Sequence, residues 1–104
     1  MSYILGNIAK QSVISVALTP AQTSANTSAE QTFTVNGLQV GDHVVVNKPT
    51  AQAGLGIVGE RVSAANTLAI TFGNFTGSGI TATAGEVYKI LLSRPDSTIT
   101  DGNI

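Results

Sequence analysis

The sequence predicts an all-β protein: a single β-sandwich or jelly-roll-like domain with extended N- and C-terminal arms. Apolar residues recur with a period of two and are often β-branched, and Gly, Pro and Asn separate these runs at regular spacing. The length of 104 residues is near the commonest domain size, and 42% hydrophobic residues supply one core. We therefore expect an N-terminal arm over residues 1–11, a β-sandwich domain over 12–93 and a C-terminal tail over 94–104.

The first two strands are expected on either side of a polar loop. Residues 12–18 are strand-like, and Pro20 denies the next ladder hydrogen bond. Residues 21–29 are small and polar, which is typical of a loop or a weakly paired edge segment. A second strand over 30–35 follows, with its Phe and Val on one face and its threonines on the other.

A turn and the most strand-like run come next. Residues 36–37, Asn-Gly, tolerate positive φ and predict a turn. Leu38 and Val40 are then expected to plug one end of the core. Residues 43–47 contain three consecutive valines and are expected in the centre of a sheet, ending before Pro49.

The later strands are separated by glycine-rich connections. Residues 54–62 predict a strand whose glycines indicate a bulge or a close backbone approach, paired as a hairpin with 68–72. In the loop that follows, Phe75 and Ile80 are expected to anchor the chain from inside. A final strand is expected over 86–92, before the polar tail.

Charge and hydropathy exclude several partners. Only 11% of residues are charged, less than half of the roughly 25% typical of globular proteins, and the net charge is −1. Such a neutral surface is easily packed against by another protein. Because Lys and Arg form no cluster, nucleic acid is not expected as a partner. No apolar run approaches the roughly 20 residues that cross a bilayer, so no membrane partner is expected, and the N-terminal residues lack a secretory-signal pattern.

Metal and cofactor sites are not expected. The chain has no cysteine, which excludes disulfides, thiolate metal sites and cysteine nucleophiles. Asp96, Asp101 and Asn103 offer oxygen ligands, but their spacing does not match a calcium loop. Residues 54–59 match G-x-G-x-x-G, yet strand-like residues follow where a dinucleotide site needs a helix.

The few titratable residues also argue against an enzyme. His43 directly follows Asp42, and one hypothesis is a general base oriented by a carboxylate. Adjacent strand residues point to opposite faces, which favours the alternative of a solvent-facing His43. Glu60 and Arg61 are interpreted in the same way, as surface or interface ion-pair partners. No catalytic residue is therefore predicted.

The two arms carry the predicted protein-contact residues. Apolar side chains outside the core of a small domain indicate contact with another protein, or an added strand on another sheet edge. The predicted contact residues are Tyr3, Ile4, Leu5, Ile8, Arg94, Ile99 and Ile104.

About two thirds of the chain, from Glu30 to Leu92, resembles small virion proteins of tailed bacteriophages. The segments that carry the likeness are residues 33–38, 41–49, 61–68 and 70–76. They are similar to segments of capsid decoration (cement) proteins and related uncharacterised virion proteins. The resemblance implies a dimer or trimer on the outer capsid surface of the virion, made in the host cytoplasm, with arms that reach across subunits of the major capsid protein.

The expected function is therefore non-enzymatic: binding the major capsid protein lattice and stabilising the shell. One alternative is another virion part, such as a head fibre base, tail tube or tail-fibre module, which copy number would distinguish. A second alternative is a carbohydrate-binding adhesin module. That alternative predicts glycan binding and an exposed aromatic patch.

Overall fold

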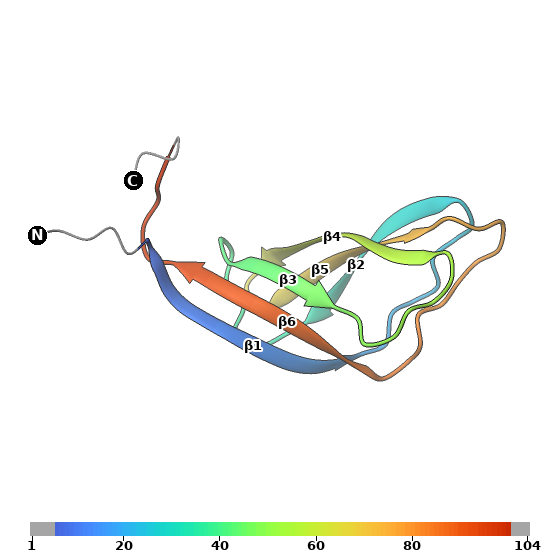
Figure 1. The fold of residues 1–104 in the computed structure, drawn as a ribbon, viewed down its shortest axis with the longest axis horizontal. Helices are drawn as coiled ribbons and strands as arrows, with labels where there is room; N and C mark the ends of the chain where they lie inside the picture. The colour runs from blue at the N-terminus through green and yellow to red at the C-terminus, as the bar shows by residue number, and fades with distance from the viewer. Residues whose placement is uncertain (1–5, 101–104) are drawn as a thin grey trace, which may run out of the picture.

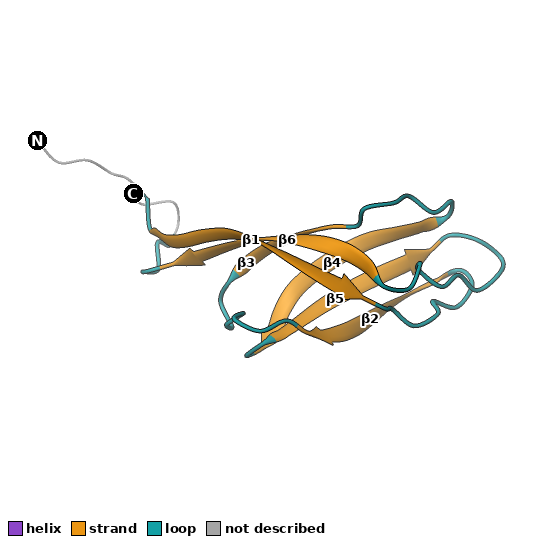
Figure 2. Cartoon of the chain, turned by 90° about the horizontal axis from the view of Figure 1, so that it is seen from below, coloured by secondary structure: helices purple, strands orange, loops and turns teal. Residues whose placement is uncertain are grey.

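The computed structural model describes residues 6–100, which form two three-stranded antiparallel sheets and no helix (Figure 1). All connections between these strands are loops and turns (Figure 2). The strands are β1 (Ile8–Leu18), β2 (Thr27–Thr34), β3 (His43–Asn47), β4 (Leu55–Ala64), β5 (Thr67–Asn74) and β6 (Glu86–Pro95). The predicted all-β class is confirmed.

One sheet has the order β1-β6-β3 and the other β2-β5-β4. The predicted hairpin of β4 and β5 is present, and its turn places Asn66 at a φ of 57°. The expectation that 43–47 is a central strand is wrong, because β6 occupies the centre and pairs with both β1 and β3. The three valines of β3 thus lie at a sheet edge.

Pairing extends the first and last strands beyond the predicted ranges. β1 begins at Ile8, opposite Pro95 of β6. The Asp96 amide then donates to the Asn7 carbonyl at 2.7 Å, just past the end of the ladder. Residues 8–11 and 94–95, expected in the arms, therefore belong to the β1-β6 ladder.

A single hydrophobic core joins both sheets. In β5, Leu68, Ile70 and Phe72 are buried on one face, and every second residue of β6 from Tyr88 to Leu92 is buried likewise. This alternation follows from the two-residue period of a strand. The buried core residues are Leu18, Val35, Leu38, Val44, Val62, Leu68, Ile70, Phe72, Ala82, Tyr88, Ile90 and Leu92.

Two side chains expected in the core are instead exposed. Leu38 is buried, as predicted, but Val40 is 71% exposed. The Asp42 amide donates to the Gln39 carbonyl at 3.0 Å, and this tight turn leaves Val40 at its tip. Phe75 is also 71% exposed, so it does not anchor its loop from inside.

The buried side chain of Asn74 anchors that loop instead. Its Nδ2 donates to the Thr23 carbonyl at 3.1 Å and to the Ser78 carbonyl at 2.7 Å. Its Oδ1 accepts from the Thr76 amide at 2.9 Å and the Thr76 hydroxyl at 2.8 Å. Four hydrogen bonds to one amide close the loop, which leaves Phe75 outside the core.

Candidate interaction surfaces

Most ionic groups of the described residues are paired with one another. The ion pairs are Lys48–Glu86 at 2.9 Å, Arg61–Glu30 at 2.8 Å and Arg94–Asp42 at 2.8 Å. Hydrogen bonds from Arg61 and Arg94 hold the pKa values of Glu30 and Asp42 below their ordinary range. The pKa of Glu86 is also lowered, most strongly by the hydrogen bond from the Thr50 hydroxyl and then by the one from Lys48. The charged residues outside these pairs, within positions 6–100, are Lys10, Glu60, Lys89 and Asp96.

Arg94 and Asp42 connect the end of β6 to the loop before β3. The Asp42 side chain is only 2% exposed, and it accepts from Arg94 Nε at 2.8 Å and from Arg94 Nη2 at 3.0 Å. Arg94 Nη2 also donates to the Gly37 carbonyl at 2.7 Å. Arg94, predicted as a contact residue, therefore has a role inside the domain.

The structure does not bring His43 and Asp42 together. His43 is exposed at the first position of β3, as the favoured interpretation predicted, while the Asp42 carboxylate faces Arg94. The partner of Arg61 is Glu30 on β2, not its neighbour Glu60. Since β2 and β4 flank β5, this ion pair crosses the outer face of the central strand, where Ala69 is buried.

The predicted contact residues of the arms are only partly within the described range. Tyr3, Ile4, Leu5 and Ile104 lie outside it. Ile8 and Ile99 are exposed. The Asn7 side chain donates to the Ser97 carbonyl at 2.6 Å, so the chain segments flanking β1 and β6 lie side by side at one end of the molecule (Figure 1).

An apolar row crosses the outer face of the β1-β6-β3 sheet, a feature absent from the predicted contact residues. Val13 pairs with Leu91, and Leu91 pairs with Val45. The three side chains are 36% to 62% exposed. We call Val13, Leu91 and Val45 the apolar row.

Polar residues border the apolar row on both sides. Two residues along the strands on one side, the residues paired across the sheet are Gln11, Ser93 and His43. On the other side they are Ser15, Lys89 and Asn47. The face therefore has an apolar centre and a polar rim. The alternation of inward and outward residues predicts which single residues of a strand are exposed. The row itself forms because the pairing register places Val13, Leu91 and Val45 side by side on three strands.

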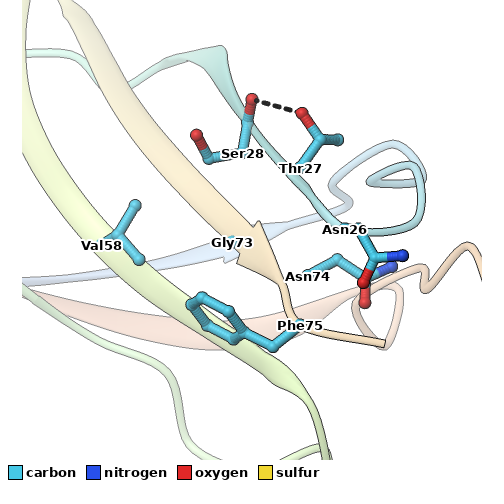
Figure 3. A pocket seen from close by; sticks show the side chains of 7 residues that line it. All are labelled: Asn26, Thr27, Ser28, Val58, Gly73, Asn74 and Phe75. Carbon is cyan, nitrogen blue, oxygen red and sulfur yellow. Dashed lines mark hydrogen bonds between the residues drawn. The ribbon is translucent and has the colours of Figure 1, made fainter. Parts of the chain in front are cut away.

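A second surface feature lies on the outer face of the other sheet. An open hollow of about 610 Å³ is lined by residues of β2, β4 and β5 and of two adjoining loops. We call it the Phe75 hollow (Figure 3). Its lining residues are Asn26, Thr27, Ser28, Val58, Gly73, Asn74 and Phe75.

Paired glycines and a β-bulge create the Phe75 hollow. Gly73 of β5 pairs with both Ser28 of β2 and Gly56 of β4. A Cβ atom on Gly73 would lie 3.0 Å from both the Phe75 ring and Val58, so the ring approaches bare backbone. Because one extra residue lies between Ile57 and Gly59 in the register, β4 bulges at Val58.

The G-x-G-x-x-G string belongs to this same region. Gly54 lies in the turn before β4, at a φ of 79°, and Gly56 and Gly59 lie within the strand. The string therefore runs through an antiparallel strand, as the sequence interpretation expected, and serves the bulge and the close approach of Phe75.

Comparisons of the chain with models of known protein families, with curated proteins and with solved structures found no match. Over positions 6–100 there is no group of three or more His, Cys, Asp or Glu side chains placed to hold a metal ion. No helix long and apolar enough to cross a membrane occurs in that part of the chain.

Proposed function

We propose that this chain is a structural protein of a bacteriophage virion, a capsid decoration (cement) protein that stabilises the shell. Its partner is the outer surface of the major capsid protein lattice, and it acts as a dimer or trimer. In this proposal the two sheets form a sandwich-like, jelly-roll-related module without enzymatic activity.

The observation that carries the proposal is the apolar row with its polar rim. An apolar centre surrounded by polar residues is the usual anatomy of a protein interface. The sheet edge can add to this contact, since β3, the strand that holds Val45, is an edge strand. The resemblance of residues 30–92 to decoration proteins favours a capsid as the partner.

The internal ion pairs support the same proposal. Three of the five basic residues are bound to carboxylates of the same chain, which leaves few charges to be desolvated when the surface is covered. Recognition then depends on shape and apolar contact more than on charge.

The proposed mechanism is mass action on the assembled shell. A protein that binds only the assembled lattice lowers the free energy of that state relative to free subunits. An oligomer that contacts several subunits at once gains avidity from each added contact. Rupture of the shell then requires these contacts to be broken as well.

The proposal is tested first by copy number. Quantitative mass spectrometry of purified particles that encode this chain should give a fixed, high ratio of the chain to the major capsid protein. A few copies per particle would contradict the decoration role and favour a tail or fibre part. Absence from the particles would remove the proposed function altogether.

Variants then test the apolar row. Val13→Lys with Val45→Lys places two charges in the row, and we expect at least a tenfold loss of binding to shells that lack the protein. Thr32→Lys with Thr34→Lys is the matched control, because both threonines are exposed on β2 of the other sheet. Equal binding by the two double variants, both folded by circular dichroism, would show that the row is not the contact.

A further inference from the structure

We propose that the Phe75 hollow is a carbohydrate-binding site that takes a neutral hexose unit. This inference is independent of the capsid proposal, because the hollow and the apolar row lie on different sheets. It begins from the exposure of Phe75, a large aromatic side chain at the surface of a small domain.

The position of the Phe75 ring leaves it available to a ligand. A Cβ atom built on Gly73 would lie 3.0 Å from Cζ of the ring, and a Cβ atom built on Gly56 would lie 3.9 Å from its Cε2. The ring therefore covers glycine backbone, while 71% of the residue's surface stays in solvent. Val58 stands beside it on the bulge of β4 (Figure 3). Ring and valine together form an apolar wall.

The opposite wall is polar and neutral. Asn26, Thr27 and Ser28 supply an amide and two hydroxyls across Gly73 from the ring (Figure 3). Among the described residues, the side-chain polar atoms of Asn26 and Ser28 have no hydrogen-bond partner, and the Thr27 hydroxyl has only a 3.5 Å contact to the Ser28 carbonyl. These groups are free to donate to and accept from a ligand.

This combination suits a sugar ring better than other ligands. A pyranose has a face of C–H groups that stacks on an aromatic ring, and hydroxyls at its rim that bond amides and hydroxyls. No ionisable side chain lines the hollow, so an anionic ligand would lack a counter-charge. The volume of about 610 Å³ lies in the range of small-molecule sites, roughly 300–1,000 Å³.

The hollow is also held in place before any ligand binds. The Phe75 amide donates to the Gly54 carbonyl at 2.8 Å, and the Asn26 amide donates to the Thr76 carbonyl at 3.0 Å. Asn26 has a φ of 52°, so its backbone is fixed in the left-handed region. Since these backbone bonds already position Phe75 and Asn26, little ordering of the backbone is needed on binding.

Binding can be measured directly on the full chain. Neutral methyl hexosides and their oligomers, with acidic saccharides as a comparison, are titrated while the amide signals of Ser28 and Gly73 are followed by NMR. We expect millimolar binding of a neutral saccharide, weakened at least tenfold by Phe75→Ala and more mildly by Ser28→Ala. Val87→Ala, at an exposed position of β6 in the other sheet, is the matched control and should bind as the unchanged protein does.

Phe75→Trp supplies a second readout. The chain contains no tryptophan, so the indole emission of this variant, excited apart from the two tyrosines, reports from the hollow alone. We expect it to keep saccharide binding, because an indole also presents a stacking face. Because Phe75 is largely exposed, both substitutions should leave the melting temperature nearly unchanged.

Three results would overturn the inference. The first is that no saccharide shifts the Ser28 or Gly73 signals or the indole fluorescence of the Phe75→Trp variant, and the second is that shifts persist unchanged in Phe75→Ala. In the third, Phe75→Ala loses binding to particles while no saccharide binds, and the hollow is then a protein contact. The apolar-row double variant should retain saccharide binding, so failure of the capsid proposal is distinguishable from failure of this one.

Discussion

At the scale of single residues, the pairing of Asp42 with Arg94 stabilises the end of β6 against the loop before β3. The carboxylate is almost fully buried and also accepts from the Gln39 amide at 2.8 Å. A buried charge of this kind is tolerated because it is paired and hydrogen-bonded. Its stabilisation therefore depends on its protonation state.

Replacing Asp42 by Asn should lower the free energy of unfolding at neutral pH by about 1–2 kcal/mol, since a charged hydrogen bond is lost. The pKa of Asp42 is lowered in the folded state, chiefly by Arg94. Its stabilisation is therefore present above the ordinary carboxyl pKa and is lost as pH falls through the lowered one, below about pH 4.

Urea denaturation at several pH values tests this expectation. Asp42→Asn should lose less stability on acidification than the unchanged protein. Glu60→Gln is the control, because Glu60 belongs to none of the three ion pairs. Identical acid profiles for Asp42→Asn and the unchanged protein would contradict the role given to this pair.

Tyr88 presents the opposite case, a buried polar atom without a protein partner. Its side chain is fully buried, and its hydroxyl meets no donor or acceptor among the described residues. Burial raises the pKa of this phenol, and the charge of Glu86 adds to the effect. Tyr88→Phe should therefore be neutral or stabilising by up to about 1 kcal/mol in urea denaturation. A clear loss of stability would show that the hydroxyl is hydrogen-bonded.

At the scale of elements, the sequence was most informative where one face of a strand is buried. Leu68, Ile70 and Phe72 alternate with small residues, and the predicted strand and its inward face are confirmed. The prediction that residues 43–47 lie at the centre of a sheet is wrong, because consecutive valines indicate a strand without indicating its neighbours. The extension of β1 to Ile8 was missed, since it depends on pairing with Pro95.

The turn before β4 offers a test of backbone conformation. Gly54 has a φ of 79°, and a Cβ atom there would overlap Thr76 Cγ2. Gly54→Ala should therefore destabilise the fold by about 2 kcal/mol. At Gly56 the added atom meets only an ordinary contact of 3.9 Å to Phe75, so Gly56→Ala should change stability by about 0.5 kcal/mol at most. Similar thermal denaturation of both variants would refute this assignment.

At the scale of the whole molecule, neither surface was predictable from sequence alone. The Phe75 hollow assembles Ser28, Gly73 and Val58 from three strands, and its shape depends on the bulge that shifts the register of β4. Phe75 was expected inside, because aromatic residues are usually buried. The feature of the sequence that could have indicated the hollow is the pair of glycines at 56 and 73. They carry no side chain to fill the space beside Phe75.

Internal charge pairing makes a prediction for binding of the whole protein. With a net charge of −1 and six ionic groups paired internally, long-range attraction to a partner should be weak. The affinity for shells should then change by less than about threefold between low and high salt. A steep salt dependence in a sedimentation assay would point to electrostatic recognition and against the apolar row.

The pairing of β1 with β6 has a consequence for the order of events during synthesis. Gln11 and Ser93 contact each other although they are 82 positions apart. Bringing such distant partners together costs conformational entropy. Because β6 follows all the other strands in the chain, β1 can pair with it only after β6 has left the ribosome. Since Leu91 of the apolar row belongs to β6, the row is complete only after β6 has been synthesised and has paired with β1 and β3.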